Sequence, residues 1–252
     1  MQKAIFGIAA FAAAFIASSA LADDSNAPIY KAPPRAVYNW SGCYVGALAG
    51  FSEHNTTVNQ FDYYSWVGWS NGGNLGGEIG CNLQDDTFVY GVEVDGSWLS
   101  NNASQQGYEY GTQSWSVNWL STFRLRTGIT AGKTLFYVTY GAALGHTSST
   151  SCYYGAYYGG CSYDSDVYSF QGSATKLGWV VGVGLERAIM DSKWTAKVEA
   201  LYVDLGDYTL CSMSSLYGCN GYYGTPYSVH NAVYIARVGL NYKFYSGGMS
   251  LY

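Results

Sequence analysis

The sequence predicts an all-β protein, an eight-stranded antiparallel up-and-down transmembrane β-barrel. Three observations predict it: stretches in which apolar and polar residues alternate with period two, aromatic residues near the ends of those stretches, and a low content of charge. Charged residues make up 12% of the chain, whereas a water-soluble domain usually carries about 25%. An outer wall that faces lipid explains the low charge and the abundance of Tyr, Trp and Gly.

Residues 1–22 have the features of a secretory signal peptide. Lys3 supplies the positive charge, a short apolar run follows, and Ala20 and Ala22 form an A-x-A cleavage site. The apolar run is too short for a membrane-spanning helix. We therefore expect export, cleavage after Ala22 and a bacterial outer-membrane location. Residues 23–39, rich in proline, are expected to form a periplasmic lead-in.

The first three predicted strands are residues 40–51, 72–83 and 87–99. In each, bulky apolar side chains share one parity, and small or polar side chains share the other. Three glycines in the first strand share one parity and leave that face with little bulk, as a narrow and crowded lumen requires. A tight turn at Asp85 and Asp86 joins the second strand to the third.

Five further stretches show the same alternation: residues 115–129, 134–145, 174–188, 194–205 and 231–244. Short turns, at residues 130–133 and through Asp191, alternate with long connections. The long connections are predicted as loops at residues 52–71, 100–114, 146–172 and 206–228. Outer-membrane barrels have short periplasmic turns and longer extracellular loops. This alternation and the even strand number place both termini on the periplasmic side.

Ten ionisable side chains lie on the polar parity with nearly balanced signs, and we expect them to pair inside the lumen. They are Glu78, Glu93, Asp95, Arg124, Arg126, Glu186, Lys197, Glu199, Arg237 and Lys243. A soluble lipocalin-like barrel also has eight strands but turns its apolar residues inward, and a solvated outer surface could also carry these charges. The signal peptide, the terminal aromatics and the low charge favour the membrane barrel.

The terminal stretch also contains a pattern that resembles the assembly signal of outer-membrane barrels. Gly239, Tyr242 and Phe244 form Gly-x-x-Tyr-x-Phe near the chain terminus. We expect the barrel-assembly machinery to recognise it. Residues 245–252 follow the usual terminal Phe as a C-terminal extension, so the predicted barrel occupies residues 40–244.

Six cysteines in an exported chain suggest disulfide bonds rather than metal ligands. Cys43 begins the first strand and Cys81 ends the second, and both share the apolar parity of their strands. An antiparallel pair can bring them face to face, so a cross-strand disulfide and two separate lipid-facing thiols are both open. The other candidates are local pairs in two long loops, Cys152 with Cys161 and Cys211 with Cys219.

Segments over nearly the whole mature chain carry a family resemblance. They are Tyr38-Asn39-Trp40-Ser41-Gly42, Tyr44-Val45-Gly46, Gly91-Val92-Glu93 with Trp98, residues 120–126, Lys197-Val198-Glu199, residues 201–206 and residues 238–244. The chain resembles the small porin-like outer-membrane immunogenic proteins of alphaproteobacteria. The resemblance implies an eight-stranded barrel with an OmpA-like membrane domain. It does not imply a particular activity. The chain departs from the family pattern at Cys43 and Cys81, where an aromatic residue would be usual.

These features favour a non-enzymatic structural and surface-interaction protein. An eight-stranded barrel is just wide enough for side chains to fill, so paired charges would plug its lumen. Expected partners are outer-membrane lipid and lipopolysaccharide, the assembly machinery, and host or surface ligands at the Tyr-rich loops. The alternative is a narrow porin-like channel for ions or small solutes. The net charge of −5 argues against nucleic acid as a partner.

No catalytic, cofactor or metal site is expected. A nucleophile needs a base within hydrogen-bond reach, and the possible bases are His54, His146 and His230, with Ser148 or Ser228 nearby in the sequence. No nucleophile motif frames these residues. A further hypothesis is that surface His and Tyr residues bind haem or a metal, but no spacing of ligand residues defines such a site.

Overall fold

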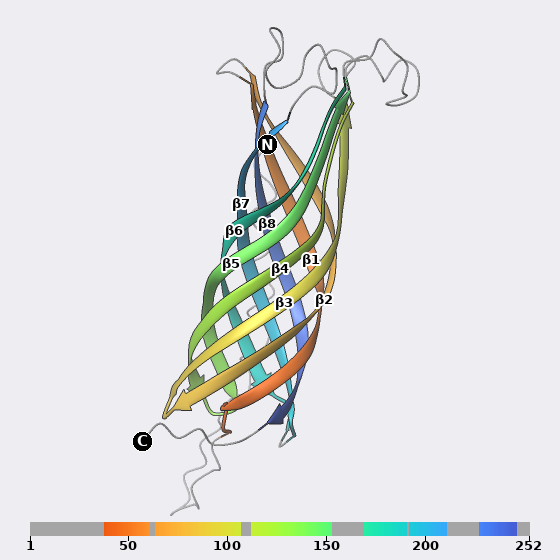
Figure 1. Cartoon of the computed structure of the whole chain (residues 1–252). Helices are drawn as coiled ribbons and strands as arrows, with labels where there is room; N and C mark the ends of the chain where they lie inside the picture. Colours follow the sequence, from red (N-terminus) through yellow and green to blue (C-terminus); the bar gives the residue numbers. More distant parts are fainter. Residues whose placement is uncertain are drawn as a thin grey trace, which may run out of the picture. The chain divides into compact units, whose positions relative to one another are not determined.

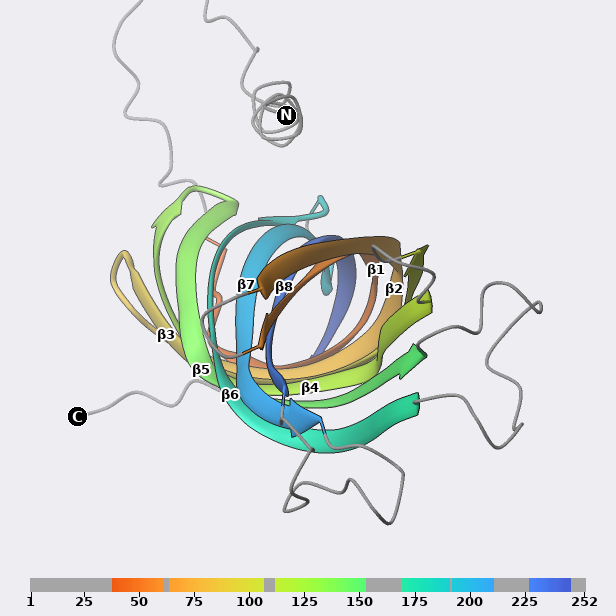
Figure 2. The same cartoon turned by 90° about the horizontal axis from the view of Figure 1, so that it is seen from above.

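The computed structural model describes residues 38–60, 64–106, 112–152, 169–190, 192–210 and 227–245. These residues confirm the eight-stranded antiparallel barrel, because each strand pairs with its neighbours in sequence and β8 pairs back to β1 (Figures 1 and 2). The strands are β1 Gly42–Gln60, β2 Tyr64–Asp85, β3 Phe88–Gln106, β4 Thr112–Ala131, β5 Thr134–Cys152, β6 Ser169–Ala188, β7 Trp194–Leu210 and β8 Tyr227–Tyr245. Within the same ranges, no helix is long and apolar enough to cross a bilayer.

The strands are strongly tilted, and the strand pairing shows why (Figure 1). The stagger can be followed from Cys43 on β1 by moving, strand by strand, to the residue paired directly opposite. This path passes Cys81, Val92, Leu125, Tyr140, Val181, Tyr202 and Tyr234, and it returns to β1 at Glu53. The sheet therefore closes with a stagger of ten residues (53 − 43) along β1. In barrels, such a stagger accompanies a strand tilt of about 35–45°, and eight strands leave room only for side chains inside.

The two faces of the wall differ as the alternation in the sequence predicted. Trp98 on β3 is 77% exposed, whereas its neighbours Ser97 and Leu99 are buried. Exposed aromatic residues recur on the outward parity around the barrel. They are Phe51, Trp69, Phe88, Tyr90, Trp98, Phe123, Phe136, Tyr140, Trp179, Trp194, Tyr234 and Phe244. Bulky apolar side chains thus form the outer surface that lipid covers.

Tight turns connect the strands at one end of the barrel, which we call the turn end. Asp86, between β2 and β3, has a φ of 51°, and Gly132, between β4 and β5, has a φ of 62°. Asp tolerates this left-handed conformation, and Gly adopts it without steric cost. Both turns lie where the sequence predicted them. The third predicted turn passes through Asp191, which lies outside the described residues, after Met190 with a φ of 52°.

At the opposite end, which we call the loop end, the strands run farther than the sequence predicted. The predicted loops at 52–71 and 100–114 are mostly strand, because β1 and β2 form one hairpin and β3 and β4 another. Outside lipid a strand needs no apolar face, so the alternation that marks it in the sequence disappears while the backbone pairing continues. The third and fourth predicted loops also lose residues to neighbouring strands.

The barrel wall is continuous around the turn end but splits along two seams toward the loop end. Pairing of β2 with β3 stops at Asn74 and Leu99, and pairing of β6 with β7 stops at Trp179 and Asp204. The other six strand pairs stay paired farther toward the loop end than these residues. Near the loop end, the wall therefore consists of two four-stranded sheets, β7-β8-β1-β2 and β3-β4-β5-β6, which diverge in Figure 1.

Candidate functional site

Nine of the ten side chains predicted to face the lumen come together inside the barrel, and each is less than 5% exposed. They are Glu78, Glu93, Asp95, Arg124, Arg126, Glu186, Lys197, Glu199 and Arg237. They come from β2, β3, β4, β6, β7 and β8. With five carboxylates and four cations, this ion-pair cluster is almost neutral. Burial of so many charges is possible only where each finds an opposite charge.

Arg124 lies at the centre of the cluster. Its guanidinium nitrogens lie 2.8 Å from a carboxylate oxygen of Asp95 and 2.8 Å from one of Glu199, and it also pairs with Glu93. Arg237 approaches the same carboxylates, with Nη2 2.7 Å from Glu199 and 3.1 Å from Asp95. These two arginines therefore bind β3, β4, β7 and β8 together across the lumen.

Arg126 and Lys197 extend the cluster toward the turn end and toward β2. Arg126 donates to Glu186 at 2.6 Å, and its guanidinium carbon lies 3.9 Å from the centre of the Tyr137 ring. Lys197 pairs with Glu78 and lies 3.2 Å from Glu93. The cluster thus crosses the full width of the lumen.

An apolar layer closes the lumen at the turn end. Trp40, which precedes β1, packs with Val89, Leu135 and Tyr137. Tyr38 lies against this layer with its ring edge-on to Trp40, at 4.9 Å between centroids. Burial, and to a lesser extent the negative charge of Glu186, raises the pKa of the Tyr38 phenol.

Lys243 makes no ion pair with the other nine predicted side chains in the described part of the chain, although it lies close enough to sense the charge of Glu186. Its ammonium donates to the carbonyl of Asn39 and lies 5.1 Å from the centre of the Tyr38 ring. Residue 243 lies on the inward parity, but it is only two residues from the end of β8. Its long side chain therefore reaches the turn end of the barrel.

A second apolar layer lies on the loop side of the ion-pair cluster. Its ten buried residues come mainly from β4 to β8. They are Leu99, Val117, Leu120, Ala143, Val180, Leu201, Val203, Leu205, Val233 and Ile235. Sequence reasoning missed this layer because it identified inward positions by their charge. The signal was present, since Val233 and Ile235 share the parity of Arg237.

Large side chains fill the space that the lumenal glycines leave. A Cβ on Gly80 would overlap the phenol of Tyr44, and a Cβ on Gly184 would overlap the ring of Tyr137. The Tyr44 hydroxyl also donates to Glu93 at 2.6 Å. Glycine at these positions therefore makes room for an aromatic ring next to the cluster. The low bulk of the glycine faces is thus compensated by side chains of neighbouring strands.

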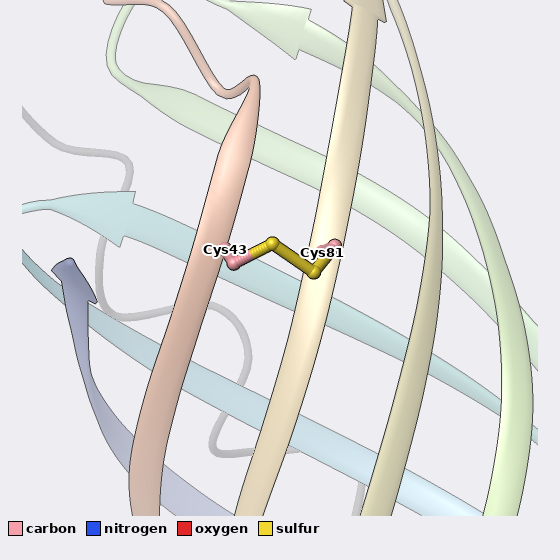
Figure 3. Close-up of a disulfide and its surroundings, with 2 residues drawn as sticks. All are labelled: Cys43 and Cys81. Atoms are coloured by element: carbon pink, nitrogen blue, oxygen red, sulfur yellow. A yellow bond between two sulfur atoms is a disulfide. The ribbon is translucent and has the colours of Figure 1, made fainter. Parts of the chain in front are cut away.

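A disulfide joins Cys43 to Cys81 on the outer side of the wall, with their Cα atoms 4.0 Å apart (Figure 3). The two residues are direct partners in the β1–β2 register. Of the two open alternatives, the structure therefore has the bridge. Cys152 lies at the end of β5, and its side chain is not among those described. Its expected partner Cys161, and the pair Cys211 and Cys219, lie outside the described residues.

The three histidines lie within strands rather than in loops. His54 is buried in the lumen, where its Nε2 lies 2.8 Å from the Asn231 carboxamide oxygen. His146 lies 3.2 Å from the Thr175 hydroxyl. His230 lies 3.0 Å from Asp207. Among the described residues, no group of three or more His, Cys, Asp or Glu could hold a metal ion.

The residues of the proposed assembly signal lie on both faces of β8. Gly239 faces the lumen, where a Cβ would crowd Leu48. Tyr242 packs against Trp194 of β7 at 5.0 Å between ring centroids, and Phe244 is exposed on the outside. Their recognition by an assembly machinery stays a prediction.

Comparisons with known proteins identify a matching family and several similar proteins. A family model described as the outer membrane protein beta-barrel domain matches residues 8–244. The chain is 32% identical to a 31 kDa outer-membrane immunogenic protein of Brucella melitensis biotype 1, over 94% of this chain and 96% of that protein. It is 28% identical to a 22 kDa outer membrane protein of Rhizobium leguminosarum bv. viciae, over 85% and 88%. Among solved structures, Ail of Yersinia pestis matches with a TM-score of 0.38 and 10% identity, over 80% and 99%.

Proposed function

The chain belongs to the outer membrane protein β-barrel domain family, and on this premise we propose that it is a non-enzymatic wall protein with a plugged lumen and a surface-interaction role. The family and the fold place it in the bacterial outer membrane. The observation that carries the proposal is the filled lumen. An apolar layer, the ion-pair cluster and a second apolar layer follow one another along the barrel.

This filling leaves solutes no continuous polar path. A channel needs polar groups that water and ions can reach, whereas the cations here already contact carboxylates from other strands, most of them across the lumen. Arg124, Arg126 and Lys197 are essentially inaccessible to solvent. Opening a path would leave several buried charges without partners, at a cost of several kcal/mol.

The proposed path to the membrane follows the parts of the chain. Residues 1–22 direct export and are cleaved after Ala22, and residues 23–39 form a periplasmic lead-in. The C-terminal extension expected at residues 245–252 starts one residue later, because Tyr245 is the last residue of β8. The assembly machinery recognises the pattern that ends in Phe244. The turn end then faces the periplasm and the loop end faces outward, where lipopolysaccharide surrounds the wall.

Recognition is proposed to occur at the loop end. Loops and strand extensions held by a rigid scaffold carry recognition in many proteins, and Tyr-rich segments make broad contact surfaces. Relatives in Brucella are named outer-membrane immunogenic proteins, which supports a role at the exposed surface. His54 and His146 lie near Thr hydroxyls, but in the described residues neither histidine has the carboxylate that would orient it as a general base, and this supports the non-enzymatic proposal.

Swelling of liposomes tests the plugged lumen. Liposomes that contain the purified, folded protein are diluted into isotonic arabinose, and a general porin serves as the positive control. We expect no swelling above that of protein-free liposomes. Swelling that grows with the amount of protein would contradict the proposal and favour the channel.

A further inference from the structure

The ion-pair cluster contains more carboxyl groups than cations. In the described part of the chain its carboxyl groups belong to Glu78, Glu93, Asp95, Glu186 and Glu199, and its cations are Arg124, Arg126, Lys197 and Arg237. If all are ionised, five carboxylates against four cations leave one negative charge in excess. Lys243 does not balance it with an ion pair, because its ammonium donates to a main-chain carbonyl at the turn end. A buried charge without an opposite charge is costly, and a proton normally neutralises it.

Glu78 receives fewer hydrogen bonds than the other carboxyl groups of the cluster. Each of the other four accepts hydrogen bonds from three side chains; they are Glu93, Asp95, Glu186 and Glu199. Among the described residues, Glu78 accepts only from Lys197, at its Oε2, and its Oε1 has no hydrogen-bond partner. Glu78 is also buried, so bulk water does not solvate that oxygen. The cluster therefore stabilises an anion least well at Glu78.

Lys197, the cation that contacts Glu78, is shared with other carboxylates. Its ammonium also lies 3.2 Å from a carboxylate oxygen of Glu93 and 3.9 Å from one of Glu199. Arg237, the other cation near Glu78, contacts two different carboxylates, at 2.7 Å and 3.1 Å. The four cations are thus engaged by the four other carboxylates. Glu78 has no cation of its own within the described residues.

The residues opposite Glu78 add negative charge on the same face of the sheet. Asp95 is its direct partner on β3, and Glu93 is its diagonal neighbour on that strand. Directly opposite side chains have Cβ atoms about 4.5–5.5 Å apart, and like charges there are destabilising. A proton on one of two carboxyl groups that share a site removes this repulsion. Asp95 contacts both Arg124 and Arg237, so the proton belongs on Glu78.

The neighbouring strands provide an acceptor for this proton. Gly46 on β1 lies between its direct partners, Glu78 on β2 and Asn241 on β8. The carboxamide oxygen of Asn241 lies over Gly46, 1.8 Å from the place where a Cβ would stand. In the described residues this oxygen has no hydrogen-bond partner, whereas the amide nitrogen donates to Glu186 at 3.1 Å. A carboxylate cannot donate to an amide oxygen, but a carboxylic acid can.

We propose that Glu78 binds a proton in the folded barrel and donates it to the carboxamide oxygen of Asn241. The proton makes the ion-pair cluster neutral, and it leaves Lys197 to Glu93 and Glu199. The proposal goes beyond the plugged lumen, because it assigns a ligand to the cluster rather than a barrier. A barrel that swells liposomes and still holds the proton would refute the plugged lumen and leave the proton site intact.

Infrared spectroscopy of the full mature protein in lipid bilayers at neutral pH tests the bound proton. The C=O stretch of a protonated carboxyl group is separate from the carboxylate bands, and it shifts in D2O. Glu78→Gln introduces a neutral group of the same shape that can still donate to Asn241. Glu53→Gln, on the outward parity of β1, is the matched control. Urea unfolding in detergent micelles compares the stability of Glu78→Gln and Glu186→Gln.

We expect the protonated-carboxyl band in the wild type and in Glu53→Gln, and its loss in Glu78→Gln. The urea midpoint should move by less than about 0.2 M in Glu78→Gln. It should fall by about 1 M or more in Glu186→Gln, which takes a carboxylate from Arg126. A wild type without the band, a band that remains in Glu78→Gln, or equal losses of stability in Glu78→Gln and Glu186→Gln would overturn the proposal. A buffer cation bound in place of the proton would also overturn it, because the wild type would then lack the band.

Discussion

The same eight strands form two different structures at the two ends of this barrel. Toward the turn end every strand pairs on both sides, and a cluster of ion pairs crosses the lumen. Toward the loop end the wall separates into two sheets, and uncharged polar side chains line the β2–β3 seam. The seams begin next to the exposed side chains of Trp98 and Trp179.

This difference shows what the bilayer requires of a strand. In hydrocarbon, no water can bond an open edge, so each backbone group needs a partner within the protein. Above the bilayer, water bonds the edge, and the constraint is absent. We infer that lipid surrounds the closed part of the wall and that the open part near the loop end lies outside the hydrocarbon.

The largest expected effect comes from breaking the ion-pair cluster. Arg124→Ala removes the cation that Glu93, Asp95 and Glu199 share and leaves these three buried carboxylates to Arg126, Lys197 and Arg237, so we expect a loss of about 3–5 kcal/mol in the free energy of unfolding. Urea unfolding in detergent micelles measures it. Arg187→Ala, at an exposed arginine of the turn end, is the control and should change stability by less than about 0.5 kcal/mol. Equal effects of the two variants would refute the structural role of the cluster.

Removal of the disulfide should have the next largest effect. The bond between Cys43 and Cys81 closes a loop across 38 positions and constrains the unfolded chain. Loss of such a constraint typically costs about 2–4 kcal/mol. The double variant Cys43→Ser and Cys81→Ser should therefore unfold at lower urea than the oxidised wild type, and reductant should shift the wild type more than the variant, which keeps the four loop cysteines. A wild type that reductant leaves unchanged would contradict the bond's contribution.

A smaller effect is expected from filling a lumenal glycine. Gly184→Ala puts a methyl group into the space of the Tyr137 ring, and we expect a loss of about 1–3 kcal/mol. Gly96→Ala is the matched control, because a Cβ there meets no atom within 4 Å. The same urea titration compares them. If Gly184→Ala is as stable as Gly96→Ala, the lumen is less tightly filled than described.

The smallest expected difference lies within one strand. Along β2, the amides of Val67, Trp69 and Asn71 face the seam, whereas those of Gly68 and Ser70 face β1. We expect the first set to exchange with deuterium roughly tenfold faster than the second. Residues near Ile79, where β2 pairs on both sides, should be uniformly protected. Uniform exchange along the whole strand would mean that the seam is closed in the bilayer.

Much of the barrel could be predicted from the sequence because lipid imposes a strict alternation. The parity of Glu93 and Arg124 follows from period two, and the opposition of Cys43 and Cys81 is allowed by antiparallel pairing of consecutive strands. Lys243 shares the inward parity but contacts Asn39 instead of a carboxylate of the cluster, because parity does not say how far a long side chain reaches. The apolar layer with Val233 and Ile235 was missed because charge served as the marker of the lumen.

The seams could not be predicted from the sequence. Residues 67–73 read as an ordinary polar and aromatic stretch, and only the point at which pairing stops shows that they form an edge. That point depends on the stagger of the whole barrel, which no local pattern encodes. For the same reason the predicted loops were too long at the loop end.

Single-channel recording in planar bilayers tests the filled lumen most directly. The wild type is inserted from detergent, and insertion is verified independently by resistance of the barrel to protease. We expect a silent membrane, and no change when Arg126 is replaced by Gln. Stable nanosiemens-scale openings of the wild type, with a conductance that Arg126→Gln alters, would contradict the account and establish a pore.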